Sequence, residues 1–226
     1  MNAPIRILLV DDEPLIRSGL SAILSREDDF AVVGEAGDGA EAWTEVRRLE
    51  PDLVMMDVRM PRMDGIQATR ALLANPQEHN VPRILILTTF ESDDYVFEAL
   101  KAGADGFLLK RAKPDELVQA VRAVAHGESI IYPAKLRELV AQYGSRGRDL
   151  IAEAGLSSRE AAVLRQLAQG HNNQEIALLM HLGVETVKTH ISAILSKLNV
   201  RDRTQAVIVA YESGFAQPVR QPPPVS

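Results

Sequence analysis

The chain has 226 residues, of which 46% are hydrophobic, and this is enough for two domains that each bury a core. It contains no cysteine, which excludes disulfides, thiolate catalysis and cysteine-ligated zinc and agrees with a reducing compartment. No apolar run approaches the length of a membrane span, and the first residues lack the pattern of a signal peptide, so we expect a cytoplasmic protein without membrane contact.

The net charge of −6 is distributed unevenly along the chain. Residues 1–127 contain 22 acidic and 14 basic residues, whereas residues 150–217 contain six of each. The acidic first half argues against contact with nucleic acid there, because phosphate binding needs Lys and Arg. If the chain binds DNA, we expect the neutral second half to do so, with little electrostatic help.

The first half alternates between predicted strands and predicted helices. Short apolar runs predict strands at 5–10, 30–33, 53–56, 83–87 and 106–109. Helical spacing of apolar residues predicts a helix after each strand; the first follows Pro14 with an apolar stripe that begins at Leu15, and the last opens at Pro114. Five such units require a parallel sheet with helices on both faces, which is the flavodoxin-like doubly wound α/β fold.

Polar residues stand where four of these strands end. They are Asp11 and Asp12, Asp57, Thr88, and Lys110. The carboxyl ends of parallel strands meet at one edge of the sheet, where such folds bind their ligands. A single carboxylate there more often caps the next helix, but this set indicates a phosphoryl-transfer site. The three carboxylates could hold Mg²⁺, while Lys110 and the Thr88 hydroxyl would bind phosphoryl oxygens.

The second half is predicted to be helical only. Gly and Pro residues in 127–153 predict a linker with one short helix at 134–143. Beyond it, Ser157 with Glu160 and Asn172 with Glu175 have the spacing of capping boxes, and further helices are expected at 184–198 and from about residue 202. We therefore expect a first domain at 1–126, a separate all-α four-helix domain at 154–217, and a disordered proline-rich tail at 218–226.

The helix at 184–198 follows the preceding helix after a short turn, which predicts a helix-turn-helix. Its buried stripe is expected to consist of Val184, Val187, Ile191, Ile194, Leu195 and Leu198. The residues that face away are Glu185, Lys188, Thr189, Ser192 and Ser196. From periodicity alone, a solvated helix surface explains this polar face slightly better than a DNA contact does.

The strand-end residues resemble, one by one, the response-regulator receiver domain of two-component signalling, and the resemblance covers roughly residues 5–125. It implies that Asp57 is the phospho-acceptor, phosphorylated by a sensor histidine kinase with Mg²⁺ as cofactor. The metal ligands would be Asp11, Asp12, Asp57 and the main-chain carbonyl of Arg59. Thr88, Phe107 and Lys110 would sense the phosphoryl group, with Phe107 as an aromatic switch residue.

Two alternatives remain beside this interpretation. Some phosphatases also use a strand-end aspartate as nucleophile, but they need a second acid two residues later, and Arg59 occupies that position. We therefore expect no enzyme activity beyond self-phosphorylation and dephosphorylation of Asp57. The other alternative is a receiver-containing regulator that acts through protein contacts or independently of phosphorylation.

Residues 156–207 resemble the LuxR-type DNA-binding domain along nearly their whole length, so that the chain as a whole resembles a NarL/FixJ-type response regulator. The resemblance implies a transcription regulator that binds promoter DNA at an inverted repeat as a homodimer when active. The implied DNA contacts are Thr186, Lys188, Thr189, Ser192 and Lys197. Three departures from the family pattern are His171, which replaces a usually apolar residue, Gln174, which replaces a common lysine, and Gly183, which stands where a serine usually caps the helix.

Overall fold

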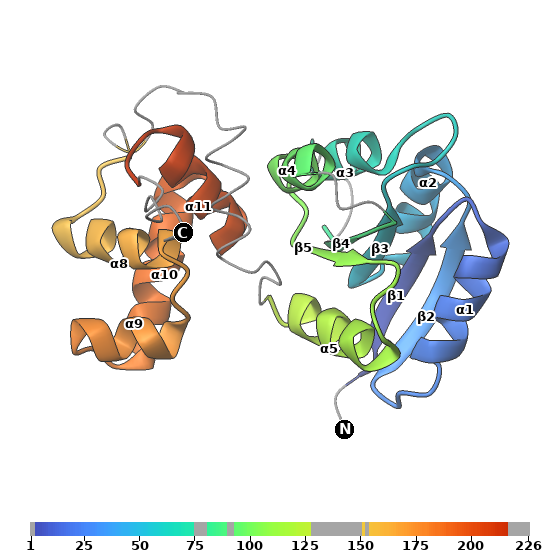
Figure 1. Ribbon diagram of the computed structural model, residues 1–226, viewed down its shortest axis with the longest axis horizontal. Helices are drawn as coiled ribbons and strands as arrows, with labels where there is room; N and C mark the ends of the chain where they lie inside the picture. The colour runs from blue at the N-terminus through green and yellow to red at the C-terminus, as the bar shows by residue number, and fades with distance from the viewer. Residues whose placement is uncertain (1–2, 75–80, 90–92, 128–150, 152–153, 217–226) are drawn as a thin grey trace, which may run out of the picture. The chain divides into compact units, whose positions relative to one another are not determined.

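The computed structural model describes residues 3–74, 81–89, 93–127, 151 and 154–216, and the chain splits into two compact units, Met1–Ile130 and Ile131–Ser226 (Figure 1). The helix expected at 134–143, most of the expected linker and the expected tail at 218–226 lie outside the described residues. Within those residues, no helix has both the length and the apolar content needed to span a membrane.

The first unit is a five-stranded parallel sheet with the order β2-β1-β3-β4-β5. Its strands are β1 Ile5–Val10, β2 Phe30–Ala36, β3 Leu53–Asp57, β4 Arg83–Thr88 and β5 Gly106–Leu109. Its helices are α1 Pro14–Leu24, α2 Gly39–Leu49, α3 Gly65–Ala74, α4 Asp93–Lys101 and α5 Pro114–Ala125. The alternation of strand and helix confirms the predicted flavodoxin-like fold.

Both faces of the sheet are covered, as the continuous apolar runs of β1 and β3 require. On one face, α2, α3 and α4 pack against side chains such as Leu8, Val54 and Ile84, all of which are fully buried. On the other face, α1 and α5 pack against Ile7 and Met55. Figure 1 shows the two groups of helices on opposite sides of the strands.

Two details of the first unit differ from the sequence-based expectation. β2 continues to Ala36, because Gly34, Glu35 and Ala36 also pair with β1 after a register shift between Ile7 and Leu8 that skips Val33. In α1, Leu15 is 84% exposed and contributes nothing to the core. Leu15 is the second residue of its helix, and side chains in a first turn can project beyond the elements on which the helix packs.

The second unit contains four described helices, α8 Ser158–Ala168, α9 Asn173–Met180, α10 Val184–Leu198 and α11 Arg203–Glu212. Both predicted capping boxes are present: the Ser157 side chain accepts from the Glu160 N–H, and the Asn172 side chain accepts from the Glu175 N–H. These caps satisfy backbone donors that a helix N-terminus leaves without partners.

Helix α10 joins α9 through the turn that the helix-turn-helix prediction requires. His181, in the left-handed region with φ 53°, ends α9, and Gly183 is the N-cap of α10. Val187 and Ile194 of α10 are fully buried, but Val184 is exposed and does not belong to the buried stripe. It is the first residue of α10, where the periodicity fails. The other residues expected in the stripe, Ile191, Leu195 and Leu198, are partly buried.

Candidate functional site

The carboxyl ends of β1, β3 and β5 bring an aspartate cluster and a lysine together. Carboxylate oxygens of Asp11, Asp12 and Asp57 lie within 4.8 Å of one another. The Lys110 Nζ lies 2.6 Å from Asp11 Oδ2 and 3.0 Å from Asp57 Oδ2. Asp11 and Asp57 are buried, with 1% and 5% of their surface exposed, while Asp12 is exposed.

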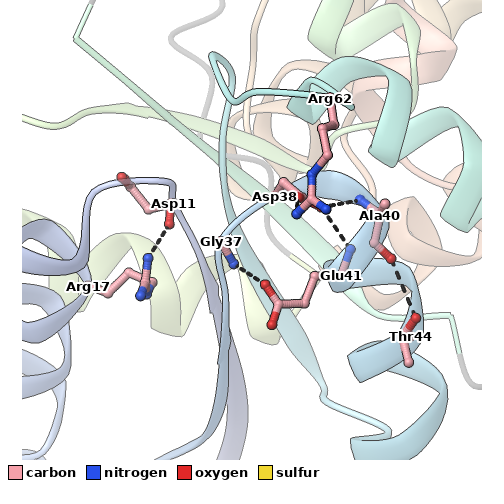
Figure 2. Close-up of polar contacts among 8 residues, drawn as sticks. All are labelled: Asp11, Arg17, Gly37, Asp38, Ala40, Glu41, Thr44 and Arg62. Carbon is pink, nitrogen blue, oxygen red and sulfur yellow. Dashed lines mark hydrogen bonds and ion pairs between the residues drawn. The ribbon is translucent and has the colours of Figure 1, made fainter.

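Local backbone contacts hold this edge of the sheet in place. The Asp11 N–H donates to the Ala36 carbonyl at 3.1 Å, and the Lys110 N–H donates to the Thr88 carbonyl at 2.8 Å. The Asp11 carbonyl accepts from the Arg17 guanidinium at 2.6 Å, as Figure 2 shows. The strand ends are therefore tied to one another and to α1, which fixes the side chains that they carry.

The electrostatics of Asp57 are set mainly by burial. Burial raises the pKa of Asp57, because it disfavours the charged form, and the nearby Asp11 charge raises it further. Hydrogen bonds from Lys110 and from the Arg59 N–H oppose this shift without cancelling it. Burial also disfavours the charged form of Lys110, but its hydrogen bonds to Asp11 and Asp57 prevail and raise the pKa of Lys110.

The donor set fits a small divalent cation. Three carboxylates and one lysine leave an excess of two negative charges in a partly buried space. Carboxylate oxygens are the ligands that Mg²⁺ prefers, and Mg²⁺ usually keeps several waters besides one or two carboxylates. Asp11, Asp12 and Asp57 could therefore hold the ion, with Lys110 turning from one of them to a bound anion.

The remaining residues expected at this site lie on β4, on β5 and directly after β3. Thr88 is buried at the end of β4, and Phe107 of β5 is partly buried against the core on the α2–α3–α4 face. Arg59 follows β3 and is exposed. Beside it opens a pocket of about 400 Å³, lined by Val58, Arg59, Met60, Asp64, Ile66 and Tyr95. The pocket therefore borders the loop that follows Asp57.

One contact near the site was not expected from the sequence. Asp38 at the start of α2 forms an ion pair with Arg62, which lies in the loop between β3 and α3 (Figure 2). The motif at residues 37–39 signals a helix cap, but nothing in the local pattern of either segment points to the other. The pairing depends on how the sheet arranges β1, β2 and β3.

In the second unit, the polar face of α10 is exposed as predicted. Glu185, Lys188, Thr189, Ser192 and Ser196 are all exposed, and Thr186 is exposed beside them. Lys188 Nζ lies 2.8 Å from Glu185 Oε1, and the Thr189 hydroxyl donates to the Glu185 carbonyl at 3.0 Å. Both interactions are local and lie at the surface, where ion pairs contribute little to stability.

Lys197, another expected DNA contact, has partners inside its own unit. Its Nζ lies 2.7 Å from Glu160 Oε2 and 3.3 Å from the Gly155 carbonyl oxygen. Glu160 is also the capping-box residue of α8, so Lys197 ties the end of α10 to the start of α8. The Lys197 hydrogen bond is the main reason that the pKa of Glu160 is lowered to about 2.

Comparison with known proteins agrees with both halves of this description. Residues 7–122 match the response regulator receiver domain, and residues 154–210 match the bacterial regulatory proteins of the luxR family. The chain is 40% identical over 217 residues to the uncharacterized transcriptional regulatory protein YxjL of Bacillus subtilis (strain 168), covering 94% of this chain and 98% of that protein.

Two further relatives cover almost the whole chain. The response regulator protein VraR of Staphylococcus aureus (strain Mu3) is 41% identical over 215 residues, covering 94% of this chain and 99% of VraR. The crystal structure of the response regulator ChrA of a heme-sensing two-component system is 37% identical with a TM-score of 0.51, covering 95% of this chain and 100% of that chain. The chain therefore belongs to the response regulators that join a receiver domain to a LuxR-type DNA-binding domain.

Proposed function

We propose that Asp57 accepts a phosphoryl group from a sensor histidine kinase in the presence of Mg²⁺, and that this modification alters dimerisation and promoter binding so as to regulate transcription. The observation that supports this proposal best is the meeting of Asp57 with Asp11 and Lys110 at one edge of the sheet. The receiver would correspond to residues 1–126 and the DNA-binding domain to residues 154–217.

Each residue of the cluster has a distinct task in this proposal. An Asp57 carboxylate oxygen attacks phosphorus while the bond from phosphorus to the histidine nitrogen of the kinase breaks, and that nitrogen leaves with the electron pair. Asp11, Asp12, Asp57 and the Arg59 carbonyl would hold Mg²⁺, which neutralises charge on the transferred group. Lys110 would leave its carboxylate partners for a phosphoryl oxygen, and the Thr88 hydroxyl would bind another.

The same arrangement favours a signalling protein over a phosphatase. Hydrolysis of an acyl phosphate at a useful rate needs a positioned acid or base. Two residues after Asp57 the chain has Arg59, whose side chain is exposed and whose guanidinium carries hydrogen-bond donors but no acceptor. The phosphorylated state should therefore persist long enough for a second event, with Thr88 and Phe107 transmitting it.

The second event in this proposal is binding to promoter DNA through α10. Thr186, Lys188, Thr189 and Ser192 are exposed on this helix, which is expected to enter the major groove. Lys197 at the other end of α10 could reach a phosphate only if it gave up part of its contact with Glu160. An inverted repeat bound by a homodimer would double the small set of contacts that one copy offers.

The decisive experiment is phosphorylation of the full-length protein with acetyl phosphate and MgCl₂, followed by intact mass. We expect a gain of one phosphoryl group that requires Mg²⁺ and is lost in Asp57→Asn, which keeps the shape of the side chain but not the nucleophile. Asp28→Asn, at an exposed carboxylate before β2, is the matched control and should label normally. Labelling of Asp57→Asn at another aspartate would refute the assignment.

A further inference from the structure

The loop at 58–64, between β3 and α3, carries two backbone groups of Arg59 that have a role at the phosphorylation site. The N–H of Arg59 hydrogen-bonds the Asp57 carboxylate, and the carbonyl of Arg59 is the proposed fourth Mg²⁺ ligand. Near Asp57 the loop is fixed: the Val58 N–H donates to the Leu87 carbonyl at 3.2 Å, and the Gly65 N–H donates to the Val58 carbonyl at 2.9 Å. The direction of the Arg59 carbonyl then depends on the conformation of the rest of the loop.

The distal part of the loop is held by the segment that begins α2. The Gly39 N–H donates to the Met63 carbonyl at 3.2 Å, and Arg62 forms an ion pair with Asp38 (Figure 2). A Cβ on Gly39 would lie 2.8 Å from the Ala68 Cβ and 2.9 Å from the Met63 carbonyl oxygen, so a larger residue would push the two segments apart. The loop that carries Arg59 is therefore fastened to a second connection of the sheet.

Asp38 needs a cationic partner at this position. Its side chain is 1% exposed, and its Oδ1 already accepts from the N–H groups of Ala40 at 2.8 Å and Glu41 at 2.9 Å. Those bonds cap α2, while the other carboxylate oxygen faces Arg62. A buried carboxylate without a counter-charge is costly, so the ion pair favours this position of Arg62, although the Arg62 side chain itself is 76% exposed.

Arg62 in turn adopts a backbone conformation that arginine does not favour. Its φ of 65° lies in the left-handed region, which glycine adopts readily and residues with a Cβ adopt at a cost. Residues held in such conformations persist where the surroundings determine them, and they gather around functional sites. Here the ion pair of the Arg62 side chain with the buried Asp38 carboxylate offsets part of the cost of the unfavourable backbone conformation.

We propose that Arg62, through its ion pair with Asp38, is a positioning residue that sets the Mg²⁺ affinity of the phosphorylation site by fixing the loop at 58–64. The inference rests on the proposed function for the identity of the site and adds a determinant that lies outside the ligand set. Arg62 is not among the residues proposed to bind the ion or the phosphoryl group. Its effect should appear in Mg²⁺ affinity and not in the rate at saturating Mg²⁺.

The test measures Mg²⁺ binding to the full-length protein by calorimetry, and phosphorylation by acetyl phosphate as a function of MgCl₂ concentration. Arg62→Gly removes the ion pair but suits the positive φ, so this variant should fold. Because groups that orient metal ligands typically influence metal affinity by about 10- to 100-fold, we expect the dissociation constant and the half-saturating Mg²⁺ concentration to rise about tenfold. The rate of phosphorylation at saturating Mg²⁺ should stay within about twofold of the wild-type rate, because a loss of Mg²⁺ affinity alone does not change the rate of the saturated protein.

Two further variants separate positioning from general destabilisation. Arg62→Lys keeps the charge next to Asp38 and should restore most of the Mg²⁺ affinity. Arg48→Gln removes another arginine that forms an ion pair, with Glu45 on the exposed side of α2, and should match the wild type. An Arg62→Gly variant with wild-type Mg²⁺ affinity would overturn the inference, as would equal losses in Arg62→Gly and Arg48→Gln.

The outcomes also distinguish this inference from the proposed function. If the wild type binds Mg²⁺ but gains no phosphoryl group at Asp57, the proposed function fails, and the calorimetric comparison still decides the role of Arg62. If the wild type is phosphorylated normally and Arg62→Gly shows the same Mg²⁺ dependence, only the positioning role fails. A wild type that does not bind Mg²⁺ would overturn both.

Discussion

The ionised carboxylate of Asp57 lowers the free energy of unfolding, because it is buried beside another carboxylate. The carboxylate is buried, and its pKa is raised because burial and the Asp11 charge outweigh the help from Lys110. A raised pKa in the folded state means that folding favours the protonated form of Asp57. At neutral pH the ionised side chain is therefore less compatible with the fold than a neutral side chain of the same shape would be.

We accordingly expect Asp57→Asn to raise the melting temperature at neutral pH when Mg²⁺ is removed with a chelator. The stability that Asp57 itself contributes is fully present below its unfolded pKa and is lost as the pH rises through its higher folded pKa. The advantage of Asn should thus be largest near pH 7 and should shrink as the pH falls toward 4. Thermal melting of both proteins from pH 4 to pH 8 measures it, and a less stable Asn variant at pH 7 would contradict the prediction.

The pKa of Glu160 is shifted in the opposite direction from the pKa of Asp57. The hydrogen bond from Lys197 is the main cause that lowers the pKa of Glu160 to about 2 in the folded protein. Its contribution to stability is complete above pH ~4.3, the ordinary value for glutamate, and is lost as the pH falls toward about 2. Glu160→Gln keeps an oxygen that can accept from the Ser157 N–H but removes the charge that Lys197 binds.

Glu160→Gln should therefore lower the midpoint of a thermal transition at pH 6 to 7, and the difference from the wild type should diminish between pH 4 and pH 2. The matched control is Glu175→Gln, which alters the other capping box at a glutamate that accepts from the Asn172 N–H at 2.7 Å. An effect of equal size in both variants would show that the cap matters and the Lys197 pair does not.

At the scale of the element, α10 presents few charges to DNA. Lys188 is the basic residue in the middle of its exposed face, and Glu185 lies one turn away with 83% of its side chain exposed. A phosphate or a base edge can replace Glu185 as the partner of Lys188 at little cost, because an exposed ion pair of this kind is weak. If α10 enters the groove, the negative charge of Glu185 would also oppose DNA binding directly.

Lys188→Ala should weaken binding of the full-length protein to a selected operator. If Lys188 touches phosphate, the loss should be similar for all sequences and the salt dependence shallower; if it reads a base, the loss should be ~1–3 kcal/mol and sequence-selective. Glu185→Gln is the matched variant, and we expect it to bind the operator more tightly than the wild type does. Fluorescence anisotropy at several salt concentrations tests both, and unchanged affinity in Lys188→Ala would exclude α10 as the groove helix.

Elements whose signals are local could be predicted from the sequence. The cap pairs Ser157 with Glu160 and Asn172 with Glu175 fix where α8 and α9 begin, and Pro114 opens α5 as expected. The same periodicity misplaced Leu15 and Val184, both in the first turn of a helix, where spacing cannot show how far the packing partners extend. The burial of a residue at a helix end depends on the neighbouring elements, and the sequence of the helix itself does not show where those elements lie.

In the candidate site, too, some features could be predicted from the sequence and others could not. Asp11, Asp57, Thr88 and Lys110 could be brought together from sequence because the rule for parallel sheets places every strand end at one edge. The Asp38–Arg62 and Lys197–Glu160 pairs could not, because each joins segments whose approach depends on the packed structure. The sequence therefore predicts the chemistry of the site but not the contacts that hold its loops in place.

At the scale of the whole molecule, the distribution of charge suggests how the two activities are coupled. The receiver half is acidic and the second half is neutral, so one copy of the DNA-binding domain should bind a half-site weakly. Two copies on an inverted repeat gain from effective concentration, which can raise affinity by about 10²- to 10⁴-fold without new contacts. Control of dimerisation would then be control of promoter occupancy.

We therefore predict that phosphorylation shifts the full-length protein from monomer to dimer and leaves the DNA-reading face of α10 unchanged. A shift from 1% to 99% of the active form needs about 5.5 kcal/mol of differential free energy, so a partial shift that depends on protein concentration is the expected result. Sedimentation with and without acetyl phosphate measures the shift, while DNA titrations compare an inverted repeat with a single half-site. Phosphorylated wild type should prefer the repeat by at least about tenfold, whereas Asp57→Asn treated in the same way should sediment as the unmodified protein does. Tight binding by a phosphorylated protein that stays monomeric would show instead that the modification acts on the DNA-binding domain of a single copy.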